Sequence, residues 1–175
     1  MITTIFFDLD GTLLPMDQDK FLEGYFQTII NRFKNDDVKK ILRAIDLGTR
    51  KMLVNDGKRT NEEVFWETFA TFFPDLKIWE ESFNEMYETD FQKLITYTNP
   101  SLVSQDVISV LKEKGYQLIL STNPLFPKIA TYSRIRWANL DPDDFSHITT
   151  YENSSSSKPN LLYYQEIMDK FNLQP

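Results

Sequence analysis

The sequence predicts an α/β fold in which a parallel sheet is interrupted by an inserted helical region. A short apolar segment, Ile2 to Phe7, is typical of a strand, and the apolar residues of the following region recur at helical spacing. From residue 99 onward, predicted helices alternate with apolar strands, which is typical of a parallel sheet with right-handed crossovers. We therefore expect a discontinuous core domain, residues 1–15 and 98–175, that carries a helical domain, residues 16–97.

The composition narrows the class of protein. The chain has 175 residues, of which 41% are hydrophobic and 26% charged, with five glycines and eight prolines, as in ordinary globular proteins. A formal net charge of −7 argues against a nucleic-acid partner, because phosphates attract basic surfaces. The absence of cysteine excludes disulfides and thiolate metal sites. We see neither a signal peptide nor an apolar run of roughly 20 residues, so we expect a cytoplasmic protein without a membrane partner.

Two carboxylates follow the first predicted strand. Ile2 to Phe7 lacks polar alternation, so we expect this strand to be buried on both faces. Asp8 and Asp10 come directly after it, and side chains two residues apart in an extended chain point the same way, roughly 7 Å apart. Two anions this close persist only if one is protonated or a cation lies between them.

The inserted region is predicted to hold four amphipathic helices, over about 21–33, 38–45, 60–72 and 79–94. Thr60 and Glu63 have the capping-box spacing that opens the third helix. Pro74 and Asp75 end that helix. Most aromatic residues of the region are expected to pack these helices together.

The second half of the chain predicts three helices and two further strands. We expect Ser104 to cap a helix that stops at Gly115, a strand over 116–124, and a helix over 126–138. A third strand over 145–152 and a helix over 159–171 complete the pattern. His147 is expected to be structural, and the acidic cluster at Asp141, Asp143 and Asp144 to form a solvated turn and cap.

Polar residues follow the ends of all three predicted strands. Asp8 and Asp10 follow the first strand, Thr122 and Asn123 the second, and a polar tract that reaches Lys158 the third. Ligands of parallel sheets bind beyond the carboxyl ends of the strands. We therefore expect the chemistry of this protein at that edge of the sheet.

The ordered motifs resemble those of a known family. "DLDGT" spans Asp8 to Thr12, "LILSTN" ends in Thr122 and Asn123, and "KP" opens a helix at Lys158. Together they resemble the haloacid dehalogenase (HAD) superfamily of aspartate-nucleophile phosphohydrolases, over essentially the whole chain. The helical insertion is similar to the small cap of the phosphoglycolate phosphatase and β-phosphoglucomutase kind. The resemblance implies a Rossmann-like, three-layer parallel sheet core with that cap.

The resemblance also implies roles for individual residues. Asp8 would be the nucleophile that forms an aspartyl-phosphate, and Asp10 the general acid and base. Mg²⁺ would be the cofactor, held by Asp8 and Asp10, and the substrate would be a small phosphorylated metabolite. The remaining implied residues bind phosphate: Leu9, Gly11 and Thr12 in the first loop, then Thr122, Asn123 and Lys158.

The chain departs from the family in one respect. Members normally carry a fourth, acidic motif after a further strand, and here the sequence ends at "KFNLQP", where that strand would begin. We therefore expect a C-terminally shortened piece with weak Mg²⁺ binding and an open edge at the first strand. A natural short form and completion by another chain are the alternatives.

Other interpretations stay open at this point. "LDGTL" could be a hairpin turn, Thr122 and Asn123 could simply end a strand, and Lys158 could be an ordinary solvated lysine. A phosphomutase needs the same two aspartates, whereas a noncatalytic binding module would explain the missing acidic motif. Dehalogenation is less favoured, because dehalogenases of the family generally lack a residue like Asp10. The substrate and the oligomeric state are not predicted.

Overall fold

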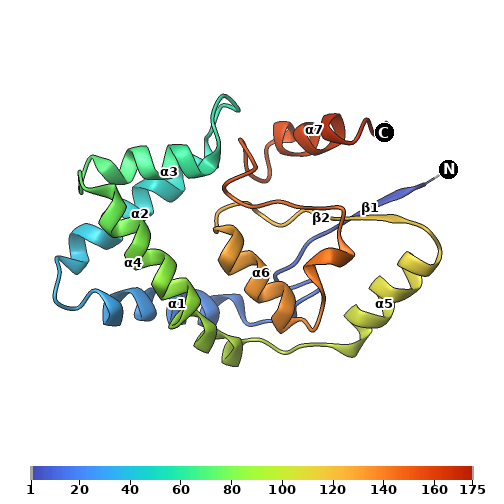
Figure 1. The fold of residues 1–175 in the computed structure, drawn as a ribbon, viewed down its shortest axis with the longest axis horizontal. Helices are drawn as coiled ribbons and strands as arrows, with labels where there is room; N and C mark the ends of the chain where they lie inside the picture. The colour runs from blue at the N-terminus through green and yellow to red at the C-terminus, as the bar shows by residue number, and fades with distance from the viewer. Residues whose placement is uncertain (1, 175) are drawn as a thin grey trace. The chain divides into compact units, whose positions relative to one another are not determined.

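The sheet of this protein is parallel, as predicted. The computed structural model describes residues 2–174, in which β1 (Thr4–Phe7), β2 (Gln117–Leu120) and β3 (His147–Ile148) form one sheet in the order β1-β2-β3 (Figure 1). Both pairings are parallel, with Phe7 opposite Leu120 and Leu120 opposite Ile148. The carboxyl ends of the strands therefore meet at one edge of the sheet.

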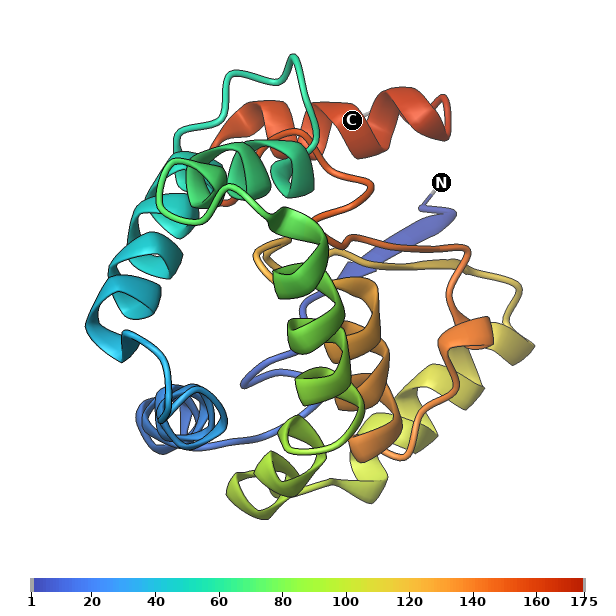
Figure 2. The same cartoon turned by 60° about the vertical axis from the view of Figure 1, so that its left-hand side comes forward.

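Helices make up most of the remaining structure. Between β1 and the helix that leads to β2, the regular elements of the chain are all helical, as predicted for an insertion. Figures 1 and 2 show α5 and α6 on the same side of the strands, as consecutive right-handed crossovers require. The helices are α1 (Gln18–Arg32), α2 (Val38–Leu53), α3 (Asn61–Ala70), α4 (Leu76–Glu88), η1 (Phe91–Tyr97), α5 (Leu102–Glu113), α6 (Lys128–Trp137), η2 (Pro142–Asp144) and α7 (Leu161–Lys170).

The chain groups into two compact units. Unit 1 consists of the residues up to Phe33, Phe83–Thr122 and Ile129–Thr149, and it contains the whole sheet. Unit 2 consists of Lys34–Ser82, Asn123–Lys128 and the residues from Thr150 onward. The division into a core of residues 1–15 and 98–175 and a cap of residues 16–97 stays a prediction.

The strands of unit 1 are shorter than predicted. β1 begins at Thr4 rather than Ile2, because its partner strand begins opposite Thr4, at Gln117. Its residues are half-buried rather than buried on both faces, since β1 pairs with β2 on one side only within the described residues. β2 is the central strand, and the side chains of residues 118–120 are buried. β3 spans two residues, because the chain turns at Thr150.

Several predicted helix boundaries are wrong. α2 continues to Leu53 rather than ending near residue 45. The predicted fourth helix does not continue to residue 94: α4 ends at Glu88, and the 3₁₀ helix η1 follows. Gln92 donates its side-chain amide to the Tyr87 carbonyl over 2.7 Å, satisfying one carbonyl of the last turn of α4. The cap of α5 is Ser101, whose hydroxyl accepts the Val103 N–H over 3.2 Å, and Ser104 is buried inside that helix.

Other local predictions are confirmed. Thr60 and Glu63 form the predicted capping box, in which each side chain accepts the other residue's backbone N–H, over 2.8 Å for Glu63 and 3.2 Å for Thr60. Gly115 follows α5 with a φ of +79°, a conformation that few other residues adopt without strain. Asp141 and Asp144 form a second capping box around η2.

Unit 2 is organised around a buried asparagine at the start of α3. The Asn61 side chain is fully buried and accepts a hydrogen bond from Asn55 over 2.9 Å. Its own amide nitrogen lies within hydrogen-bond distance of the Pro124 carbonyl, 3.1 Å away, and of the Ser157 hydroxyl, 3.2 Å away. Asn61 thereby connects α3 to the two segments of unit 2 that follow β2 and β3.

Candidate active site

The loop after β1 carries the predicted first motif. Asp8, which is half-buried, directly follows the last residue of β1, and the fully buried side chain of Leu9 anchors the loop in the core. The Leu9 carbonyl accepts the N–H groups of Thr12 and Leu14, over 3.1 and 2.8 Å. Gly11 has a φ of +77°, which permits this tight turn. The alternative hairpin does not form, because β1 pairs only with β2 among the described strands.

The backbone of this loop is engaged in the turn itself. The N–H of Gly11 donates to the Leu14 carbonyl over 2.9 Å, and the N–H of Thr12 donates to Leu9. A phosphoryl group would therefore meet these two N–H groups only by replacing bonds within the loop. The phosphate-binding roles of Leu9, Gly11 and Thr12 stay predictions.

Thr122 lies at the same edge of the sheet as the first motif. The Ser121 N–H donates to the Phe7 carbonyl over 2.7 Å, so the chain continues the β1–β2 pairing to this point. Thr122 is buried, and its carbonyl accepts the Thr149 hydroxyl over 2.6 Å. Unit 1 therefore places Thr122 and the Asp8 loop at the carboxyl ends of two paired strands, as predicted from their positions in the sequence.

Asn123 and Lys158 come together in unit 2. The backbone N–H of Lys158 donates to the Asn123 side-chain oxygen over 3.2 Å. The Lys158 ammonium nitrogen lies 5.9 Å from the centre of the Tyr163 ring, within range of a cation–π interaction. The predicted site residues thus form two groups, each of which lies within one compact unit.

Asp10 forms an ion pair that the sequence did not lead us to expect. Its Oδ2 contacts Nη1 of Arg134, a residue of α6 whose side chain is only 1% exposed. The guanidinium also donates from Nε to the Ala130 carbonyl and from Nη2 to the Thr131 hydroxyl, both over 3.3 Å. A buried charge needs such partners, because its removal from water is costly. The Asp10 carboxylate therefore compensates the buried positive charge of Arg134.

A pair of buried tyrosines belongs to the same unit. The hydroxyls of Tyr25 in α1 and Tyr87 in α4 are 2.8 Å apart. Burial raises the pKa of Tyr25 to about 12, against the opposing effects of the hydrogen bond with Tyr87 and of the positive charge of Arg134. The positive charge of Arg134 therefore acts on Tyr25 in α1 as well as on Asp10.

The donor atoms around Asp10 suit a hard cation. Its backbone carbonyl accepts the Gln18 amide over 3.3 Å, and the half-buried Asp8 carboxylate lies two residues earlier in the same loop. Carboxylate and carbonyl oxygens are the ligands that Mg²⁺ takes in proteins. Within residues 2–174, no group of three or more histidine, cysteine, aspartate or glutamate residues forms a metal cluster. Asp8 and Asp10 therefore supply oxygen donors of the kind that Mg²⁺ binds.

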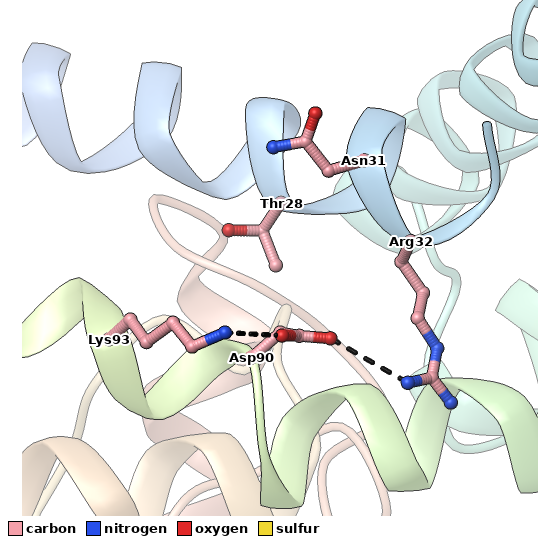
Figure 3. Close-up of a pocket in the computed structure, with 5 residues that line it drawn as sticks. All are labelled: Thr28, Asn31, Arg32, Asp90 and Lys93. Atoms are coloured by element: carbon pink, nitrogen blue, oxygen red, sulfur yellow. Dashed lines mark hydrogen bonds and ion pairs between the residues drawn. The ribbon is translucent and has the colours of Figure 1, made fainter.

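A polar pocket of about 330 Å³ also lies in unit 1, between α1 and η1, and Figure 3 shows its lining. Asp90 pairs there with Lys93 over 2.8 Å and with Arg32 over 3.6 Å. Thr28 and Asn31 complete the lining. Because Asp90 pairs with both cations and the pocket contains none of the predicted site residues, we assign it no chemistry.

Comparisons with known proteins agree with this architecture. A family model described as haloacid dehalogenase-like hydrolase matches residues 5–175. No curated protein matches the chain. None of the helices within residues 2–174 combines the length and the apolar composition that a membrane span requires.

Several solved structures share the fold. A predicted phosphoglycolate phosphatase from Haemophilus somnus 129pt is 18% identical, with a TM-score of 0.54 over 98% of this chain and 72% of its own. The L-2-haloacid dehalogenase from Xanthobacter autotrophicus is 14% identical, with a TM-score of 0.52 over 100% of this chain and 67% of its own. The HAD-hydrolase YfnB from Bacillus subtilis, in a form bound to magnesium, is 20% identical, with a TM-score of 0.53 over 97% of this chain and 74% of its own.

Proposed function

Because the chain belongs to the family of haloacid dehalogenase-like hydrolases, we propose that the protein is a Mg²⁺-dependent phosphohydrolase acting on a small phosphorylated metabolite. The observation that supports this most directly is the placement of Asp8 and Asp10 in a tight loop at the carboxyl end of β1. Thr122 follows the paired strand β2 at the same edge. Carboxylates and a hydroxyl at that edge suit the transfer of a phosphoryl group.

The proposed reaction has two steps. A carboxylate oxygen of Asp8 attacks phosphorus and breaks the bond to the alcohol oxygen, while Asp10 gives that oxygen a proton. The product is an aspartyl-phosphate on Asp8 and a free alcohol. Water then attacks phosphorus, Asp10 takes the proton of the water, and inorganic phosphate leaves as the Asp8 carboxylate is restored.

The charge of the substrate requires further partners. A bound Mg²⁺ would neutralise charge on the phosphoryl group, and the Asp8 carboxylate and the Asp10 carbonyl are the groups that would hold it. The Thr122 hydroxyl would donate a hydrogen bond to a phosphoryl oxygen. The resemblance also assigns phosphate binding to Asn123 and to Lys158, the latter as a point charge.

The experiment that tests this proposal is phosphate release by the full-length protein with Mg²⁺. The substrates are a panel of sugar, nucleotide and glycolate phosphates, and we expect at least one to be hydrolysed. Asp8→Asn should abolish that activity, because an amide does not form the acyl-phosphate intermediate. Asp106→Asn, an exposed position in α5, is the matched control and should retain it. Hydrolysis of no ester, or full activity of Asp8→Asn, would overturn the proposal.

A further inference from the structure

We propose that Arg134 is a positioning residue that holds Asp10 in the orientation needed for proton transfer to the leaving oxygen. This inference rests on the proposed function and assigns a role to a residue that none of the motifs contains. It begins from the contact between Arg134 Nη1 and Asp10 Oδ2, which joins α6 to the loop after β1.

The two carboxylate oxygens of Asp10 have different surroundings. Oδ2 contacts the guanidinium, whereas Oδ1 is buried and lacks a hydrogen-bond partner within residues 2–174. A buried polar atom without a partner is costly, and in a site it indicates a group that a ligand is to contact. The ion pair thus distinguishes the two oxygens and leaves Oδ1 for the reacting group.

Arg134 is itself held rigidly. Its side chain is 1% exposed and donates to the Ala130 carbonyl and to the Thr131 hydroxyl, both within the preceding turn of α6. The planar guanidinium therefore has little freedom to rotate away from Asp10. A proton donor must stay close to the geometry that allows transfer. A neighbouring side chain that packing holds in one conformation, as Arg134 is held, keeps the donor there.

A purely structural ion pair would also bury Arg134, so the test must separate the two roles. A general acid matters more for a poor leaving group than for a good one, because a good one departs without its proton. Phenyl phosphate and p-nitrophenyl phosphate offer this contrast with nearly the same shape. A loss of folded protein lowers both rates equally, whereas a misplaced acid lowers the phenyl phosphate rate selectively.

The experiment measures kcat for both esters in the full-length wild type and in four variants. Arg134→Ala removes the guanidinium. Arg134→Lys keeps the positive charge but loses the planar set of N–H donors, and it serves as the second variant if the alanine variant does not fold. Asp10→Asn removes the acid itself. Arg136→Ala, at an exposed position two residues further along α6, is the matched control.

We expect both Arg134 variants to lose roughly a hundredfold in kcat on phenyl phosphate and less than about tenfold on p-nitrophenyl phosphate. Arg136→Ala should match the wild type. Adding Arg134→Ala to Asp10→Asn should cause little further loss, because the two residues act as one unit. Binding of trifluoroberyllate, which mimics a phosphoryl group on Asp8, should survive in the folded Arg134 variants.

Two outcomes would overturn the inference, and they are distinguishable. If the wild type hydrolyses esters but the Arg134 variants lose both rates equally, Arg134 has only a structural role and the proposed function stands. If the wild type hydrolyses neither these two esters nor any of the metabolite panel, the proposed function fails and the inference fails with it.

Discussion

Tyr25 shows at the scale of one residue how burial links ionisation to stability. Its folded pKa is raised to about 12 from an ordinary value of 10.0, chiefly by burial, so the folded state favours the neutral phenol. Between these two values the unfolded chain has lost the proton and the folded chain has kept it. The contribution of Tyr25 to stability is therefore complete below about pH 10 and is lost as the pH rises toward 12.

We expect Tyr25→Phe to remove this pH dependence. Urea unfolding of the wild type and the variant at pH 9 and pH 11.5 measures it. Relative to the variant, the wild type should lose about 2 kcal/mol of its free energy of unfolding between the two conditions. A difference between the two proteins that stays constant with pH would contradict this account of Tyr25.

The sequence points to some candidate site residues and not to others. It predicts Asp8, Thr122 and Lys158 because each follows a predicted strand in an ordered motif. Arg134 is not among them, because a charged helix residue is normally solvent-exposed. The residues three or four positions on either side of Arg134 are small or apolar in the sequence, which indicates a buried helix face. They are Ala130, Thr131, Trp137 and Ala138, and all four are buried in the structure.

At the scale of elements, the start of α3 shows what a local motif contributes. Thr60 and Glu63 complete a capping box that satisfies two backbone N–H groups at the start of this helix. Thr60→Ala should therefore cost about 1 kcal/mol of stability, measured by urea unfolding at pH 7. Thr60→Ser keeps the hydroxyl and should cost much less. Equal losses in both variants would mean that the cap does not contribute.

Elements differ in how well their ends can be predicted. The capping box and Gly115 mark helix ends through local hydrogen bonds and backbone conformation, so these boundaries were found. The start of β1 depends instead on where its partner β2 begins, which an apolar run does not reveal. The change from α4 to η1 was also missed, since the apolar spacing continues through Phe91 and Leu94 while the backbone hydrogen bonding changes.

At the scale of the whole molecule, the parallel topology is what the sequence predicted best. Alternating helices and apolar segments are sufficient to indicate parallel strands, and their polar ends mark the edge where ligands bind. One of the borders between the compact units falls between Thr122 and Asn123, and nothing in the sequence indicates it. Such a border depends on contacts between segments far apart in the chain.

The most direct test of the central claim is a fluorine NMR titration of the full-length protein with beryllium fluoride and Mg²⁺. Trifluoroberyllate mimics a phosphoryl group on a carboxylate, so no substrate needs to be known. We predict a saturable bound signal in the wild type that requires Mg²⁺ and disappears in Asp8→Asn. The absence of a bound signal in the wild type, or an equal signal in Asp8→Asn, would contradict a phosphoryl-transfer site at the end of β1.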